Sequence, residues 1–156
     1  MNEREGMRLA VEKAKEGIAA GQSPFGASVI DGDRVVAVAH NTVWRDRDPT
    51  AHAEINAIRQ AAAALGSIDL SGRIMFSTCE PCPMCLAAIH WSKITRVVFG
   101  ATIADAAAAG FSELRVPARE LAKLGGSPLR VESGLLEEEC RALFQLWKKS
   151  ATSPSY

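Results

Sequence analysis

The sequence predicts an α/β fold with a five-stranded mixed sheet, and three observations lead to this prediction. Strand-like and helix-like patterns alternate along the chain, which is typical of α/β proteins. The first two strand patterns are separated by Asp31, Gly32 and Asp33, a strong signal for an antiparallel hairpin. The later strand patterns are separated by helical ones, and such connections place strands parallel to one another as right-handed crossovers.

The chain is expected to begin with a helix that leads into the hairpin. Asn2 and Glu5 have the spacing of a capping box, apolar residues then recur at helical intervals, and Gly21 is expected to end the helix. Residues 27–30 and 35–39 have the composition of strands and flank the turn. They are therefore expected to form the antiparallel pair.

A polar loop at 41–49 is expected to lead to a second helix at 51–65. Thr50 is a good N-cap, the following residues are rich in alanine and free of glycine, and Gly66 is expected to end the helix. His52 and Glu54 lie at the start of this expected helix.

The middle of the chain is expected to contain a strand at 74–77, a helix at 84–91 and a buried strand at 96–100. Pro81 or Pro83 suits the first turn of that helix, where a missing backbone N–H costs nothing. The cysteine-rich motif between strand and helix is therefore placed at a helix start.

The stretch between the fourth and the fifth strand is too long for a hairpin. It is expected to be a helical crossover with helices at 105–110 and 117–124, which makes the last strand, 129–132, parallel to its neighbour. A terminal helix at 135–149 carries acids early and lysines late, as the helix dipole prefers. Residues 150–156 are expected to form a short polar tail.

The composition is typical of one soluble domain spanning residues 1–156. No stretch has the length and apolarity of a membrane span, and the charged N-terminus does not resemble a signal peptide. Four cysteines fit a reducing cytoplasm better than a disulfide framework, and Cys79 and Cys140 are expected to be buried apolar residues. The net charge is zero and no basic stripe is present, so neither a nucleic acid nor a membrane is expected as a partner.

Three residues have the spacing of a split metal site. Cys82 and Cys85 form a C-x-x-C pair, and His52 lies about 30 residues upstream. In a helix that starts near Pro83, residues three apart share a face, so both sulfurs can reach one ion. Two thiolates and one imidazole leave a fourth position open, which is typical of a catalytic zinc site, whereas a structural site is closed by four ligands. No other residue has the spacing of a convincing fourth ligand.

His52 and Glu54 can serve one site only at the start of a helix. In mid-helix, residues two apart point about 200° away from each other. At a helix N-terminus, side chains tilt back and can converge beyond the first turn. The cysteine pair is expected at a second helix start, so two helix N-termini would face one metal. Their partial positive charges favour thiolates and a bound hydroxide.

His52-x-Glu54 followed by Pro81-Cys82-x-x-Cys85 resembles the zinc-dependent cytidine deaminase superfamily. The resemblance implies a three-layer α-β-α fold, a Zn²⁺ cofactor held by the His and the two Cys residues, and hydrolytic deamination with Glu54 as the carrier of protons. Two other interpretations of the pattern are a redox C-x-x-C pair and a purely structural zinc site. The redox interpretation needs no upstream His-x-Glu, and the structural one leaves Glu54 without a task.

The resemblance also implies substrate contacts. Asn41 resembles the residue that binds the edge of the base after the second strand, although asparagine is also a common strand-terminating residue. Ala53 resembles the residue whose backbone N–H binds the base. Phe25 resembles a wall of the pocket, with plain core packing as an equal alternative. Trp91 is also predicted to contact the substrate.

Three features resemble bacterial guanine deaminases in particular: the motif at 79–85, the segment 105–111, and the chain end at Tyr156. In that family an acid soon after the Ala-Gly-Phe run contacts the purine, and the C-terminal tyrosine closes the pocket, reaching across from a partner subunit. The acid here is Glu113, where the family has Asp. The segment 131–140 departs from this pattern and is similar to the transfer-RNA adenosine deaminases.

These resemblances imply a homodimeric cytoplasmic enzyme that deaminates a free purine base, most simply guanine to xanthine and ammonia. The tail at 150–156 is then a possible lid. The alternatives are a transfer-RNA adenosine-to-inosine deaminase, a deaminase of related aminated heterocycles, and a non-enzymatic binding module stabilised by zinc. The last of these predicts no ammonia release and unfolding when the metal is removed.

Overall fold

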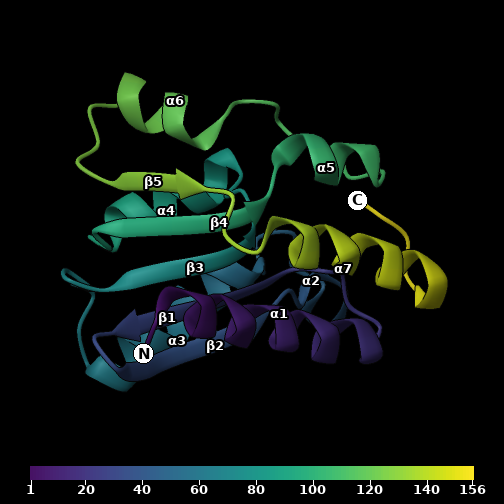
Figure 1. Ribbon diagram of the computed structural model, residues 1–156, viewed down its shortest axis with the longest axis horizontal. Helices are drawn as coiled ribbons and strands as arrows, with labels where there is room; N and C mark the ends of the chain where they lie inside the picture. Colours follow the sequence, from purple (N-terminus) through teal and green to yellow (C-terminus); the bar gives the residue numbers. More distant parts are fainter.

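The computed structural model describes all 156 residues. Its elements are α1 (Glu3–Ala19), β1 (Gly26–Asp31), β2 (Arg34–His40), α2 (Val43–Asp46), α3 (Ala53–Leu65), β3 (Ile74–Cys79), α4 (Pro83–Trp91), β4 (Arg96–Ala101), α5 (Ile103–Ala108), α6 (Ala118–Leu124), β5 (Arg130–Ser133) and α7 (Glu137–Ser150). The five strands form one sheet in the order β2-β1-β3-β4-β5 (Figure 1). The first hairpin is antiparallel and β3, β4 and β5 are parallel, as the sequence predicts.

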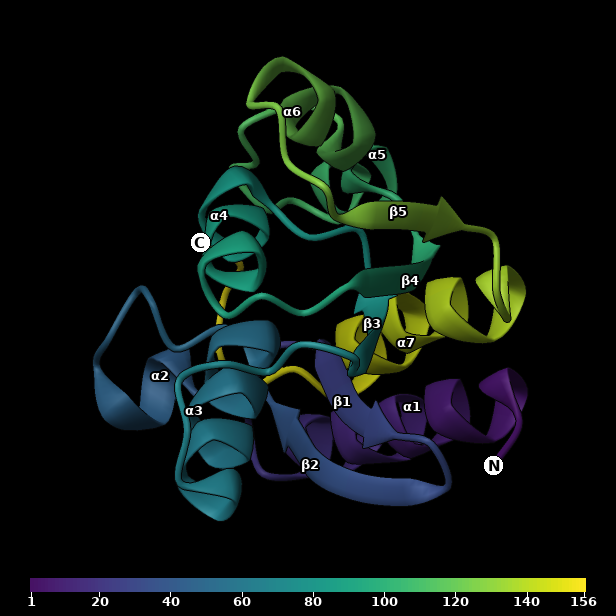
Figure 2. The same cartoon turned by 90° about the vertical axis from the view of Figure 1, so that its left-hand side faces the viewer.

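The helices cover both faces of the sheet and complete three layers. Helices α1 and α7 pack on one face, where 17 buried apolar residues form one core cluster. Helices α3, α4 and α6 lie on the other face, where 18 buried residues form the second cluster (Figure 2). None of the helices combines the length and the apolar character that a membrane crossing requires.

The structure confirms the predicted caps at the start of α1 and at the end of α3. The side chain of Asn2 accepts a hydrogen bond from the backbone N–H of Glu5, and the Glu5 carboxylate accepts one from the N–H of Asn2, so the capping box of α1 is formed. Gly66 ends α3 in the left-handed conformation, with φ 61°. Both cysteines expected in the core, Cys79 and Cys140, are buried.

Four local expectations were wrong. The last helix, α7, begins at Glu137 and not at residue 135, because Leu136 is its N-cap in the left-handed conformation. The expected loop after β2 contains a one-turn helix, α2. The second long helix starts at Ala53 with His52 as N-cap, because the Thr50 hydroxyl donates to Asp48 instead of capping the helix. Helix α5 begins two residues earlier than expected, because Thr102 forms a capping box with Asp105.

Candidate active site

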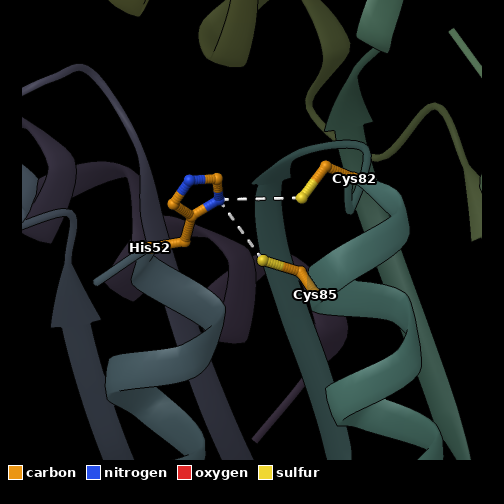
Figure 3. A group of neighbouring side chains, drawn as sticks. All are labelled: His52, Cys82 and Cys85. Atoms are coloured by element: carbon orange, nitrogen blue, oxygen red, sulfur yellow. Dashed lines mark hydrogen bonds between the residues drawn. The ribbon is translucent and has the colours of Figure 1, made fainter. Parts of the chain in front are cut away.

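Two helix starts, one from each side of a cleft, bring the predicted metal ligands together. His52 is the N-cap of α3 and Cys82 is the N-cap of α4. The Nδ1 atom of His52 lies 3.7 Å from the Sγ atom of Cys82 and 3.4 Å from that of Cys85 (Figure 3). The three ligand atoms all lie within 4.8 Å of one another.

These distances fit a zinc ion. With zinc–sulfur and zinc–nitrogen bonds of about 2.3 and 2.1 Å, a tetrahedral site separates its nitrogen and sulfur ligands by roughly 3.5 Å. The donor set of two sulfurs and one imidazole is one that zinc prefers. His52, Cys82 and Cys85 therefore form the candidate zinc site, with a fourth tetrahedral corner left free by the protein.

The local sequence explains why these side chains converge. Pro83 is at the first position of α4, where its missing N–H is not needed and its fixed φ starts the helix. At the other helix start, the Asn56 side-chain amide donates to the carbonyl oxygens of His40 and Ala51 and to the Thr42 hydroxyl. These bonds attach the first turn of α3 to the end of β2 and hold the loop that presents His52.

The electrostatics of the helix starts favour a thiolate. A hydrogen bond from Cys85, supported by one from His52, lowers the pKa of Cys82 to about 4. The Cys85 thiol keeps its proton in that pair, and the shared hydrogen bond followed by burial raises its pKa. Metal binding releases such a proton, because zinc takes cysteine as a thiolate.

Glu54 lies beside the ligands but is not one of them. It is in the first turn of α3, and only 6% of its surface is exposed. One of its carboxylate oxygens lies 3.3 Å from the hydroxyl of Ser77 on β3. Burial, followed by the negative charge of Cys82, raises the pKa of Glu54. A buried carboxyl with a raised pKa beside a metal site is a typical carrier of protons.

A cavity of about 270 Å³ opens above this centre. Its lining joins the metal ligands, the acid and an apolar wall. The lining residues are Phe25, Pro49, His52, Glu54, Cys79, Glu80, Cys82, Pro83, Met84, Phe111, Ser112, Glu113, Leu114 and Tyr156. Phe25 lines the cavity and also packs edge-on against Phe111 and Phe144, with ring centroids 5.0 and 5.7 Å away, so both interpretations of this residue hold.

The C-terminal tail lies over the cavity of its own chain. Asn41 is fully buried, its Oδ1 accepts from the N–H of Val43, and its Nδ2 donates to the Tyr156 hydroxyl at 2.6 Å. The N–H of Ser112 donates to a main-chain oxygen of Tyr156 at 2.9 Å. The Tyr156 ring lies 6.0 Å from the ring of His52. The resemblance to guanine deaminases implies a tyrosine that reaches across from a partner subunit, whereas in this structure Tyr156 contacts Asn41 and Ser112 of its own chain.

Glu113 and Ala53 are also at the cavity or next to it. Glu113 is half-buried in the segment after α5, and burial, followed by the negative charge of Cys82, raises its pKa to about 7. A carboxyl group that titrates near neutral pH is typical of functional sites. Ala53 is the first residue of α3, where the backbone N–H has no partner within the helix.

Trp91 is the one predicted site residue that the structure places elsewhere. It is 80% exposed at the far end of α4 and lines a separate cavity between α4 and α6, together with Leu121. The prediction was wrong because α4 runs away from the metal centre, and six residues after Cys85 amount to about 9 Å along a helix.

Other residues around the cavity were not predicted from the sequence. Met84 lies between the two cysteine ligands in the sequence, and Leu114 follows Glu113. Their position next to predicted site residues could have indicated that they line the cavity. Trp44 on α2 packs edge-on against Tyr156, with ring centroids 6.1 Å apart. No local pattern in the sequence pointed to Trp44, since its helix was itself unexpected.

Comparisons with known proteins agree with this geometry. A profile of the cytidine and deoxycytidylate deaminase zinc-binding region matches residues 1–101. The chain is 44% identical over 114 residues to guanine deaminase from Bacillus subtilis, covering 72% of this chain and 73% of that protein. It is 34% identical over 134 residues to a tRNA-specific adenosine deaminase of the same species, covering 86% and 81%. The structure of guanine deaminase from Nitrosomonas europaea superposes with a TM-score of 0.87 at 31% identity, covering 95% of this chain and 85% of that one.

Proposed function

The chain belongs to the zinc-binding cytidine and deoxycytidylate deaminase family, and we propose that it hydrolyses guanine to xanthine and ammonia. The observation that carries this proposal is the seat of Tyr156 over the metal centre. Its hydroxyl bond to the buried Asn41 and its main-chain bond to Ser112 hold it against a cavity of about 270 Å³, which it lines. That volume is below the roughly 300–1,000 Å³ of pockets for drug-sized ligands, and so suits a free base.

The chemistry follows from the residues at the centre. When bound, zinc lowers the pKa of a bound water to about 7 and so supplies a nucleophile at neutral pH. Glu54 accepts one proton from the water and delivers it to the ring nitrogen beside the reacting carbon. It then takes the second proton from the new C–OH group and delivers it to the departing amine, which leaves as ammonia. A C–O bond forms and the C–N bond breaks, so that guanine and water become xanthine and ammonia.

Glu113 is proposed to bind the base edge that distinguishes guanine. A purine with a ring N–H and an exocyclic amine offers two parallel donors, which suit a carboxylate. The backbone N–H of Ala53 is proposed to hold the remainder of the base, and Phe25 with Phe111 provides an apolar wall. Asn41 is proposed to act on the base through its hydrogen bond to Tyr156, since it is fully buried. This arrangement leaves Glu54 free to move protons.

A transfer-RNA adenosine deaminase is the second candidate. It is favoured by the 34% identity to such an enzyme over 86% of this chain. Against it, the wobble nucleotide of a folded RNA would have to displace Tyr156 from its two hydrogen bonds. The net charge of zero also provides no general attraction for a polyanion.

An ammonia-release screen tests the proposal. Guanine, other aminated purines, pyrimidines and triazines, their nucleosides, and transfer RNA are offered to the zinc-loaded protein at equal concentrations. We expect guanine to have the highest kcat/KM. Inosine formation in transfer RNA at a higher kcat/KM would favour the second candidate, and no ammonia from any substrate would favour a binding module.

Glu113→Gln is expected to lower kcat/KM for guanine by about 10–100-fold, because a hydrogen bond to a charged group contributes roughly 1.5–3 kcal/mol. Gln keeps the side-chain volume but turns one acceptor into a donor facing another donor. Steady-state kinetics with a melting curve checks the result. Glu120→Gln, on the exposed side of α6, is the matched control and should behave as wild type. Unchanged kinetics in Glu113→Gln would show that this acid lies outside the recognition of the base.

Removal of residues 151–156 is expected to raise KM for guanine while the melting temperature changes little, because α7 ends at Ser150 and remains complete. Tyr156→Phe removes only the hydroxyl that Asn41 contacts. One such bond contributes about 1 kcal/mol, so this variant should lose roughly fivefold in kcat/KM. The larger loss should belong to the truncation, and equal kinetics in all three proteins would rule out a lid.

We also propose a homodimer that acts in the cytoplasm. Trp91 on α4 and Leu124 on α6 are 80% and 83% exposed, and apolar surface of this kind is commonly covered by a partner. All four cysteines are reduced, and two of them are candidate zinc ligands, which suits a reducing compartment. Sedimentation analysis is expected to give the mass of two chains, and Trp91→Glu is expected to give the mass of one.

A further inference from the structure

One segment provides several of the residues that line the cavity. It runs from Ile103, at the start of α5, to Ala118, at the start of α6. Between these ends, Phe111 and Glu113 line the cavity, and Ser112 holds Tyr156 through its backbone N–H. The position of this segment therefore determines where the proposed base-binding acid and the lid lie relative to the metal centre.

A single carboxylate holds both ends of the segment. The Oε2 atom of Glu80 accepts a hydrogen bond from the N–H of Ile103 at 2.9 Å, and its Oε1 atom accepts one from the N–H of Ala118, also at 2.9 Å. Both donors are the first N–H of a helix and have no partner within it. The negative charge also suits two helix N-termini.

The two helix starts depend on Glu80 to different degrees. Helix α5 has its own capping box, formed by Thr102 and Asp105. Helix α6 begins after Pro117, which makes no side-chain cap bond, so Glu80 supplies the cap that Pro117 cannot. Loss of Glu80 should therefore loosen the end of the segment nearer to Glu113 more than the other end.

Glu80 is itself fixed to the metal-binding loop. It follows directly on β3, whose last residue, Cys79, pairs with Ala101 of β4. Its own N–H donates to the carbonyl oxygen of Ala101 at 2.8 Å. The zinc ligand Cys82 is only two residues further along the chain. A rigid strand end thus connects the loop that binds the metal with the segment that would bind the base.

We propose that Glu80 is a positioning residue. It fixes the distance of Glu113 and of the Tyr156 lid from the zinc centre, so that both can contact the bound base. The inference rests on the proposed function, because those two residues are its substrate contacts. Glu80 lines the cavity, but both of its carboxylate oxygens accept hydrogen bonds from backbone N–H groups of the segment. It acts through the backbone of the segment 103–118, and its effect should therefore appear in the binding of the base more than in the metal content.

Glu80→Gln tests the inference with almost no change in volume. The amide offers one oxygen for two N–H donors and points its own NH₂ group at one of them. We expect kcat/KM for guanine to fall about 10–100-fold, with a raised KM, as for a reacting group displaced by about 1 Å. Zinc content should stay at one per chain. A merely destabilised protein would instead show a lower active fraction, with kcat reduced and KM unchanged.

Glu80→Asp and Glu120→Gln complete the kinetic experiment. Aspartate keeps the charge but is one methylene shorter, so it can reach only one of the two helix starts. Its kcat/KM for guanine should lie between those of the wild type and Glu80→Gln. Glu120→Gln removes a charge from the exposed face of the same helix and should leave KM as it is in wild type. If Glu80→Gln retains the wild-type KM and kcat, the positioning role is wrong.

A second measurement does not depend on the substrate. Amide hydrogen exchange by NMR should show faster exchange at Ala118, and a smaller change at Ile103, in Glu80→Gln. Tyr156 is the only tyrosine of the chain, so its ring signals report the seat of the lid without ambiguity. They should shift in Glu80→Gln and not in Glu120→Gln. Unchanged exchange and unchanged ring signals would overturn the inference even if the protein does not act on guanine. Changed signals in a protein without guanine turnover would refute only the proposed substrate.

Discussion

Replacing Glu54 with Gln is expected to reduce the rate of deamination by about 10⁴-fold or more while zinc content stays normal. A general acid–base group typically raises the reaction rate by about 10²–10⁴-fold, and Glu54 is proposed to carry out several proton transfers in sequence. The structure favours the upper end, because Glu54 is 6% exposed and lines the cavity beside the three candidate ligands. Water has little access to replace it as a proton carrier.

The measurement is single-turnover ammonia release from guanine, with zinc determined on the same sample. Gln keeps the shape of the side chain and can still meet the Ser77 hydroxyl, which lies 3.3 Å from the native carboxylate. Ser77→Ala is the companion variant, because it removes that neighbour and keeps the carboxylate. It should lose far less activity than Glu54→Gln. A Glu54→Gln protein that keeps more than about a tenth of the wild-type rate would show that another group carries the protons.

The parts of the site that could be predicted are those specified by local sequence. A C-x-x-C pair after a proline places two sulfurs on one helix face, and His52 with Glu54 converge only at a helix start. These are properties of a few adjacent residues, and the structure brings the three ligands within 4.8 Å. The directions of the strands in the first hairpin and in the later part of the sheet also followed from connection lengths, because short turns give antiparallel pairs and helical crossovers give parallel ones.

The parts that could not be predicted depend on contacts between distant residues. Helix α2 is a single turn supported from outside, since Gln22 accepts a hydrogen bond from the N–H of Arg45. The position of the C-terminal tail depends on the bond between Asn41 and Tyr156, which are 115 residues apart. Trp91 shows the converse error. It is near the ligands in sequence, but the helix carries it to another surface.

Loss of one zinc ligand is expected to abolish both metal binding and deamination. Metal analysis of the wild type should give about one zinc per chain, and Cys85→Ala should give almost none. The matched control is Cys140→Ala, the same change at a buried cysteine that belongs to the core cluster on the opposite face. It should keep its zinc and its activity at a cost in stability. Activity that survives in Cys85→Ala, or stoichiometric iron in place of zinc, would contradict the assignment.

Removal of zinc by a chelator should abolish activity and leave the fold in place, and this outcome separates an enzyme from a module that zinc merely stabilises. None of the three ligands belongs to either core cluster, so the 18 and 17 buried residues that hold the layers together remain packed without the ion. Far-ultraviolet circular dichroism of the metal-free protein should therefore match that of the loaded one, and added zinc should restore ammonia release. Cooperative unfolding on chelation would instead assign the metal a structural role, because in such sites the free energy of metal binding is the free energy of folding.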